Sequence, residues 1–392
     1  MSSTAYSQPL PNSGVKINFY GGIPYLLIPD KELPLSVEEI CEKAANYVAS
    51  LLPSSPDTED GAVGYRMASL TLPMFSLINP HHTQWMTMRE KLNRHDFLYE
   101  YFFRIRFRFF TSNLRDLEKL DRQTWEYLFW QFRDDFVNDR FHSMYNKDLE
   151  RPKVLGFVVM GYFIPKLTTM AQNSPVHGST YRQLQSSNKV HPRVTVCGLK
   201  KHLPQRERLS FRWPWPYYRL YRSVKEEVGI FAGSHGNIGV ERYMQTYMNG
   251  VLEEVAKYGS ECYLAIELLQ TNPDRTQAVD IVVDPFCSRP PGIYFYLEFV
   301  CRFEDVENLV LATSSDPAFG VEVRLIRRNG APKILRFKES KMAESFVSCV
   351  DGYCRLLHNF YDSIATQVLV EPPLTHPAQG TQGFWTNADS RC

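Results

Sequence analysis

The densest group of side chains that could bind a charged partner lies between Pro192 and Lys225. This stretch holds nine basic residues and one acidic residue, a charge of +8 in a chain whose net charge is +1. Six aromatic residues lie among them, from Phe211 to Tyr221. The basic residues are Arg193, Lys200, Lys201, Arg206, Arg208, Arg212, Arg219, Arg222 and Lys225.

Three interpretations of this basic stretch compete. It is a solvated surface, a surface for an anionic membrane or an acidic peptide, or a site for single-stranded nucleic acid. Each basic residue near anionic lipid contributes about 1 kcal/mol to binding. Aromatic rings between cations also suit single strands. No nucleic-acid-binding motif accompanies the stretch, so we expect no nucleic-acid partner.

Motifs for catalysis are not found in the sequence. It has no phosphate-binding G-x-x-x-x-G-K-[ST] loop, no V-A-I-K, H-R-D or D-F-G kinase motif, and no G-x-S-x-G or H-E-x-x-H pattern. The glycines of Gly233–Gly239 precede a predicted helix without a preceding strand, which favours a flexible connection over an anion site. We therefore predict no catalytic residue, no metal and no cofactor in this chain.

The composition is that of a globular protein with two or three domains. The 392 residues are 44% apolar and 22% charged, and they include 25 Phe, 22 Tyr and 6 Trp. The longest uncharged apolar stretch, Val154–Pro165, is too short for the roughly 20 residues that span a bilayer. The eight cysteines form no C-x-x-C pair, and no secretory signal opens the sequence, so we expect a cytoplasmic location.

Residues 15–112 are predicted to form a small mixed α/β unit after a disordered segment, residues 1–14. Residues 15–20 and 24–29 resemble two strands joined by a turn at Gly21 and Gly22. Ser36 and Glu39 have the spacing of a capping box at a helix start. The apolar stripe of this helix is Val37, Ile40, Cys41, Ala44, Ala45, Val48 and Leu51.

The strand that closes this unit has a two-residue alternation. Phe103, Ile105, Phe107 and Phe109 alternate with Arg104, Arg106 and Arg108. Since successive side chains of a strand point to opposite faces, the pattern predicts a buried aromatic face and an arginine face turned to water.

Residues 113–259 have helical spacing. Asp121 is a predicted N-cap, and a second helix is expected from Lys153 to Met170, ended or kinked at Pro165. A third is expected to stop with Gly259 at its C′ position. The stripes expected in the first and third helices are Trp125, Leu128, Phe129, Phe132, Phe136 and Val137, and Val240, Tyr243, Met244, Tyr247, Val251, Leu252 and Val255.

Residues 260–362 return to the period of strands. Six short runs, 261–269, 278–283, 292–300, 308–313, 319–326 and 333–337, precede one helix that Ser340 can cap. We expect an antiparallel barrel or sandwich plugged by this helix. Residues 363–392 are rich in Pro, Gly and Thr and indicate a linker or tail. The expected fold class is thus α+β and multidomain.

Three stretches resemble the FERM region of the Janus kinases, the non-receptor tyrosine kinases of JAK-STAT signalling. Residues 98–110 are similar to the strand that ends the first lobe of that family. Residues 240–263 are similar to the last helix of its second lobe and the turn that follows. Residues 343–357, with the sequence AESFVSCVDGYCRLL, resemble its closing helix, and the likeness covers about residues 15–370.

The resemblance implies a three-lobed cloverleaf of a ubiquitin-like lobe (15–112), a helical acyl-CoA-binding-protein-like lobe (113–259) and a pleckstrin-homology-like lobe (260–362). It implies a non-catalytic module that docks the membrane-proximal cytoplasmic tail of a cytokine receptor, at the inner face of the plasma membrane or of endomembranes. An anionic membrane surface is a second expected partner, and kinase domains would act in cis if the chain is a fragment. Phe346, Val350, Gly352 and Tyr353 are the expected structural signature of the closing helix.

Residues Lys200, Lys201, Arg206, Arg208, Arg212, Arg219, Arg222 and Lys225 are the receptor- or lipid-binding candidates. Two other functions stay open: a linker between cytoskeleton and membrane of the ezrin or band 4.1 type, and a phosphotransfer enzyme. The missing kinase motifs argue against the enzyme, and residues 371–392 show no helical or basic repeat of an actin-binding tail.

Overall fold

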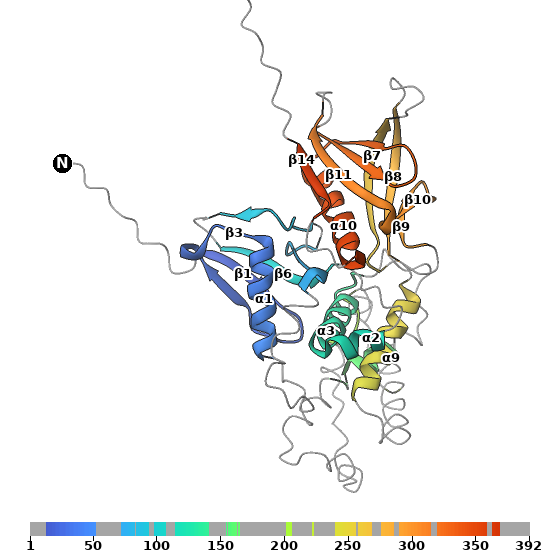
Figure 1. Ribbon diagram of the computed structural model, residues 1–392. Helices are drawn as coiled ribbons and strands as arrows, with labels where there is room; N and C mark the ends of the chain where they lie inside the picture. Colours follow the sequence, from blue (N-terminus) through green and yellow to red (C-terminus); the bar gives the residue numbers. More distant parts are fainter. Residues whose placement is uncertain are drawn as a thin grey trace, which may run out of the picture.

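The computed structural model describes residues 13–51, 72–82, 84–93, 98–106, 114–140, 154, 156–162, 164, 201–205, 222, 240–255, 258–268, 276–285, 290–314, 320–358 and 363–368. They form three lobes (Figure 1): one coloured blue to cyan, a helical one in green and yellow, and one in orange and red. Buried residues of the first two lobes form one continuous apolar cluster, and those of the third lobe form a cluster of their own.

The first lobe is a four-stranded sheet with a helix against it. The strand order is β2-β1-β6-β4, where β1 (Gly14–Asn18) runs antiparallel to β2 (Leu26–Pro29) and parallel to β6 (Leu98–Ile105). Strand β4 (Phe75–Ile78) pairs antiparallel with β6. A short pair, β3 (Leu35–Ser36) with β5 (Lys91–Leu92), completes the lobe. The predicted hairpin is confirmed, because Gly21 and Gly22 have φ of 73° and 77° in its turn.

Helix α1 (Val37–Leu51) begins as the capping box predicts. The Glu39 carboxylate accepts a hydrogen bond from the Ser36 backbone N–H at 2.7 Å, and the Glu39 N–H donates to Ser36 Oγ at 3.2 Å. The predicted stripe from Val37 to Val48 is buried, but Leu51, at the last helical residue, is exposed.

The second lobe is helical. Its described helices are α2 (Leu114–Leu120), α3 (Arg122–Val137) and α9 (Val240–Glu254), with further helical residues between 154 and 164. Asp121 caps α3 by accepting from the Thr124 N–H at 3.1 Å, and the predicted stripe from Trp125 to Phe136 is buried. The predicted end of the third helix was wrong: α9 ends at Glu254, and Gly259 lies in a separate turn with φ of 87°. Pro165 lies outside the described residues.

The third lobe is an eight-stranded sheet closed by a helix. The strand order is β10-β9-β8-β7-β13-β12-β11-β14. Helix α10 (Ser340–His358) follows β13, and its apolar stripe enters the core of the lobe. The strands are β7 (Glu261–Leu268), β8 (Thr276–Asp284), β9 (Gly292–Phe295), β10 (Glu298–Arg302), β11 (Val306–Thr313), β12 (Val321–Arg327), β13 (Lys333–Phe337) and β14 (Ala365–Val368).

Two sequence predictions for this lobe need correction. The run from 292 to 300 was expected as one strand, but Tyr296 and Leu297 have φ of 50° and 70° and turn the chain into a hairpin between β9 and β10. Two successive residues in the left-handed region fit a two-residue hairpin turn, which glycine or asparagine usually signals. Residues 365–368, expected in a linker, pair in parallel with β11 as β14.

Among the described residues, no helix combines the length and the apolar character needed to cross a membrane.

Candidate functional site: the junction of the three lobes

The arginines of β6 are buried, which overturns the expectation that they face water. Arg104 is 9% exposed and Arg106, just after the strand, is 3% exposed. Arg108 lies outside the described residues. The alternation predicted correctly that these side chains leave the strand opposite Phe103, but the second and third lobes cover that face.

Arg104 joins the first lobe to the second through a buried ion pair with Asp135 of α3. Its two terminal nitrogens each donate to a different oxygen of the carboxylate, both at 2.6 Å, and Nη1 also donates to the Tyr20 hydroxyl at 3.2 Å. Burial by itself would lower the pKa of the Arg104 guanidinium, but Asp135 outweighs burial and holds this pKa above its usual range. Arg140 adds a second cation to Asp135 at 3.1 Å.

Arg106 joins the first lobe to the third. Its Nε and Nη2 donate to the two carboxylate oxygens of Glu261, at the start of β7, at 2.8 Å and 2.9 Å. The same guanidinium donates to the Ser345 carbonyl at 3.0 Å and to the Ser348 hydroxyl at 3.3 Å, both on α10. It also lies 5.2 Å from the centre of the Trp85 ring, within cation–π range. One side chain thus contacts a strand and a helix of the third lobe.

Gln131 of α3 joins the second lobe to the end of β6. Its amide accepts from the Ile105 N–H at 2.9 Å and donates to the Ile105 carbonyl at 3.1 Å, as a neighbouring strand would. The same amide nitrogen contacts the Tyr258 hydroxyl at 2.6 Å. The Tyr353 hydroxyl of α10 donates to the Gly259 carbonyl at 3.0 Å. These bonds connect all three lobes through the turn that follows α9.

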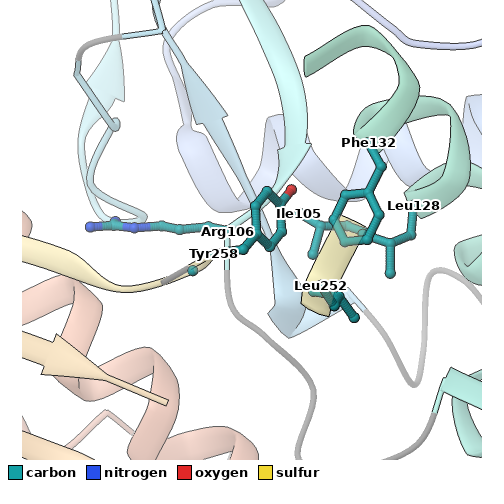
Figure 2. Close-up of a pocket in the computed structure, with 7 residues that line it drawn as sticks. Ile105, Arg106, Leu128, Phe132, Leu252 and Tyr258 are labelled. Atoms are coloured by element: carbon teal, nitrogen blue, oxygen red, sulfur yellow. The ribbon is translucent and has the colours of Figure 1, made fainter. Parts of the chain in front are cut away.

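A small cavity lies beside these contacts (Figure 2). Ile105, Leu128, Phe132 and Leu252 gather around it, while the Arg106 guanidinium extends away from that apolar group. Its volume is about 10 Å³, roughly the space that one water molecule needs. Among the described residues, this part of the junction is therefore a packed contact between lobes. No group of three His, Cys, Asp or Glu in the described part of the chain is placed to hold a metal.

The predicted basic stretch is described at two of its candidate positions. Lys201 and Arg222 are both exposed. Beside Lys201, the His202 ring contacts the Arg133 guanidinium of α3 at 2.8 Å, which places residues 201–205 on the second lobe. The other candidates, Lys200, Arg206, Arg208, Arg212, Arg219 and Lys225, lie outside the described residues, so their role in binding stays a prediction.

The signature residues of the closing helix lie in the third-lobe core. Phe346, Val350 and Tyr353 are fully buried, and Gly352 is partly buried. Polar residues of the same motif point the other way: Ser345 and Ser348 meet Arg106, and Asp351 accepts the Ile364 N–H at 2.8 Å.

The three stretches that carry the family resemblance meet at this junction. Residues 98–110 supply Arg104 and Arg106, residues 240–263 supply Tyr258 and Glu261, and residues 343–357 supply the α10 contacts. Sequence reasoning did not single out Arg104, Arg106, Asp135 or Glu261 as a site. The usable signal was two arginines, two residues apart, one inside and one just after a strand whose other residues are almost all aromatic or aliphatic.

Comparisons with solved structures identify the fold. The complex of the FERM and C-terminal domains of Drosophila Merlin matches 89% of this chain and 97% of that chain, with 11% sequence identity and a TM-score of 0.51. The second MyTH4-FERM domain of Dictyostelium discoideum myosin VII matches 86% of this chain and 58% of that chain, with 12% identity and a TM-score of 0.46. No protein-family model and no curated protein matches the sequence. The Merlin match, together with the three lobes described above, shows that the chain has the three-lobed α+β FERM fold.

Proposed function

We propose that this chain is a FERM interaction module that docks the membrane-proximal cytoplasmic segment of a cytokine receptor and regulates an attached tyrosine kinase. The observation that carries the proposal is the meeting of the three Janus-kinase-like stretches at one junction between lobes. In isolation each stretch is a short resemblance. Together they supply the donors and the acceptors of the contacts between lobes, such as those of Arg106 with Glu261 and Ser345.

The buried ion pairs at the junction suit a module that holds a partner across more than one lobe. A buried ion pair is often no more stabilising than an apolar pair of the same size, and its best-attested use is to specify one arrangement. Arg104 and Arg106 fix the second and third lobes against the same strand. Preorganised lobes spare an extended partner the ordering cost of bringing them together.

The basic stretch would supply the receptor or membrane contacts. Lys201 is exposed on the second lobe, next to the His202–Arg133 contact. A receptor segment close to the bilayer would place this lobe near anionic lipid, where each basic residue contributes about 1 kcal/mol. The module would then act in the cytoplasm, at the inner face of the plasma membrane or of endomembranes.

The test is capture of the full chain by biotinylated membrane-proximal peptides of cytokine receptors, with and without phosphatidylserine-containing vesicles. We expect capture that weakens when Lys200, Lys201, Arg206 and Arg208 are changed to Glu, and that weakens further as salt is added. Reversal of four exposed lysines elsewhere, Lys31, Lys91, Lys338 and Lys341, changes the net charge equally and should leave capture intact. Capture that resists both the first reversal and salt would reject the role of the basic stretch.

A cytoskeleton–membrane linker of the ezrin or band 4.1 type is the second candidate, because the FERM fold is shared by both. Co-sedimentation of the full chain with filamentous actin separates the two. The receptor proposal expects the chain to stay in the supernatant, and pelleting with actin but no capture by any receptor peptide would favour the linker.

A further inference from the structure

The outer face of strands β7 to β10 carries a group of exposed apolar side chains. Of the nine large apolar side chains that are exposed among the described residues, four lie here. They are Leu264 on β7, Tyr296 and Leu297 in the turn between β9 and β10, and Phe299 on β10, and we call them the outer apolar patch. Leu264 is 60% exposed and Leu297 is 67% exposed. Figure 1 shows the four strands side by side in the third lobe.

The register of the strands brings these side chains together. The neighbours of Leu264 along β7 enter the core of the lobe, so Leu264 itself points to the opposite face. It lies across from Asp280 of β8, whose carbonyl accepts the Tyr296 N–H at 3.0 Å. On β10, Phe299 lies opposite Tyr294, and the centres of their rings are 5.5 Å apart. The patch is therefore one continuous surface across four strands.

The patch has a charged border on the far side of β7. The same face continues onto β13, where Arg336 lies opposite Ile266, and onto β12, where Glu322 lies opposite Arg336. The Glu322 carboxylate accepts from Arg324 Nε at 3.1 Å and lies 3.5 Å from Arg336 Nε. An apolar centre with a polar rim is the usual anatomy of a surface that binds another protein.

The turn between β9 and β10 holds two large side chains in a conformation that favours glycine or asparagine. Tyr296 and Leu297 have φ of 50° and 70°. Large residues strain the backbone in this region, and such strain is concentrated at functional sites. Asparagine and glycine would close the same hairpin without strain, but they would remove half of the patch. The strain is a second observation, independent of exposure, that these side chains have a use.

The charge and the backbone of this face indicate the kind of partner that it fits. Asp280 is exposed between Leu264 and Tyr296, Glu298 is exposed next to Leu297, and no ion pair of the described residues reaches either carboxylate. A bilayer would have to take up these charges with the apolar side chains, and anionic lipid would repel them. Strands β7, β8 and β9 each have a neighbouring strand on both sides, so the face offers side chains and not a free backbone edge.

We propose that the outer apolar patch is a docking site for an amphipathic helix of a partner protein that places basic residues against Asp280 and Glu298. A helix satisfies its own backbone and packs an apolar stripe on a sheet face, which is what this surface requires. Leu264 and Phe299 contact apolar residues of the partner that are spaced three and four apart. The site lies on the third lobe, so it goes beyond the receptor and membrane contacts proposed for the second lobe.

The probe for this site is a fluorescent synthetic helix of about 18 residues, long enough to cross the four strands. It carries a leucine stripe flanked by arginines, and its binding to the full chain is followed by fluorescence anisotropy. Leu264→Ser combined with Phe299→Ser should weaken binding at least about tenfold. Leu51→Ser is the matched control and should leave binding intact, because Leu51 is also exposed but lies on α1.

The role of charge is tested with a second peptide in which glutamates replace the arginines. Asp280→Asn should weaken binding of the arginine peptide about two- to fivefold, as expected for an exposed ion pair, and should not weaken binding of the glutamate peptide. Glu307→Gln removes an exposed carboxylate on β11 and should alter neither affinity.

The strained turn is tested with Tyr296→Asn combined with Leu297→Gly. This variant should unfold at a higher temperature than the wild type, because both new residues suit the turn, and yet bind the arginine peptide more weakly. Circular dichroism and thermal unfolding check that every variant is folded. If the Leu264 and Phe299 double variant does not fold, Leu264→Asn alone should show the same direction of change.

Equal affinity of the arginine peptide for the wild type and for the Leu264 and Phe299 double variant, or no binding to either, would overturn the proposal. Two further results would overturn the choice of partner. Binding to phosphatidylserine-containing vesicles that the double variant loses would favour a membrane. A concentration-dependent dimer that the double variant loses would favour a second copy of this chain.

Discussion

Arg106 and Glu261 form a two-pronged ion pair between the first and third lobes, with the guanidinium fully covered and the carboxylate nearly so. Such a pair is unlike a surface salt bridge, because neither charge regains its water if the other is removed. The energetic consequences differ accordingly, and they can be measured one side chain at a time.

Removing one partner of this pair should be strongly destabilising. Arg106→Ala leaves the Glu261 carboxylate without its cation, and we expect a loss of about 3–5 kcal/mol in the free energy of unfolding. Arg106→Met combined with Glu261→Met should recover most of that loss, since an apolar pair of similar volume costs no charge burial. Urea unfolding of the single and double variants measures both values. Lys43→Ala, which breaks the exposed pair with Glu32, should cost at most about 1 kcal/mol.

Replacing Gln131 with a side chain of similar size that lacks the amide oxygen or the amide nitrogen should destabilise the protein. Gln131→Glu keeps an acceptor for the Ile105 N–H but places a second oxygen against the Ile105 carbonyl, and Gln131→Met satisfies neither group. We expect about 1–3 kcal/mol of destabilisation for each buried group left unpaired. Hydrogen exchange should show faster exchange of the Ile105 amide in Gln131→Met. An unchanged exchange rate there would contradict the strand-like role of the amide.

Two adjacent glycines in the turn between β1 and β2 allow a contact between lobes to be tested, because only one of them lies against the second lobe. Gly21 and Gly22 both have positive φ, but a Cβ at Gly21 would lie 2.8 Å from the Trp130 ring of α3, whereas one at Gly22 meets nothing within 4 Å. Gly22→Ala should cost about 1–2 kcal/mol for backbone strain alone. Gly21→Ala should cost about 1–3 kcal/mol more than Gly22→Ala, because the added Cβ overpacks the contact with Trp130. Thermal unfolding of the two variants side by side isolates the Trp130 contact.

His82 should make the protein less stable in mild acid. The centre of its ring lies 4.7 Å from that of Phe102, with the two rings tilted by 43°, and its two nitrogens have no hydrogen-bond partner in the described structure. Burial, reinforced by the positive charges of Arg140 and Arg104, lowers the pKa of His82 to about 3. Below pH 6.5 the His82 ring binds a proton in the unfolded chain but not in the folded chain. Stability is therefore lost as the pH falls from 6.5 toward 3.

The variant for this test is His82→Asn, because asparagine tolerates the φ of 56° at this position and does not titrate in this range. Between pH 6.5 and pH 5, the free energy of unfolding of the wild type should fall more steeply than that of the variant, by at most about 1.4 kcal/mol per pH unit. Urea unfolding at several pH values provides the slopes. Parallel slopes for the two proteins would show that another group governs the acid response.

Local signals in the sequence predicted local structure well. The Ser36–Glu39 box and the Asp121 cap act within one helical turn, so their residues alone determine the outcome. The stripe of α10 was also predictable, since helical spacing reports which side chains share a face. The order of a mixed α/β lobe, a helical lobe and a strand-rich lobe followed from where the spacing changes along the chain, whereas the FERM cloverleaf was implied by the resemblance.

Structure that depends on partners distant in sequence was not predictable in the same way. A two-residue alternation shows that Arg104 and Arg106 leave β6 on one face, but not that Asp135 and Glu261 cover that face. Strand β14 is four residues long and pairs with β11, more than fifty residues earlier, so neither its length nor its composition distinguished it from a linker. The hairpin at Tyr296 and Leu297 lacks the glycine or asparagine that usually signals such a turn.

Helix α10 presents an apolar face to the third-lobe sheet and a polar face to its other neighbours, and both faces are defined by residues between Ser345 and Tyr353. One inserted residue ahead of Ser345 would rotate every later side chain by about 100° about the helix axis. Phe346 would leave the core at the same moment as Ser345 left Arg106. Length variation among relatives of this chain should therefore be confined to the connections between elements, while the residue count of this helix stays constant.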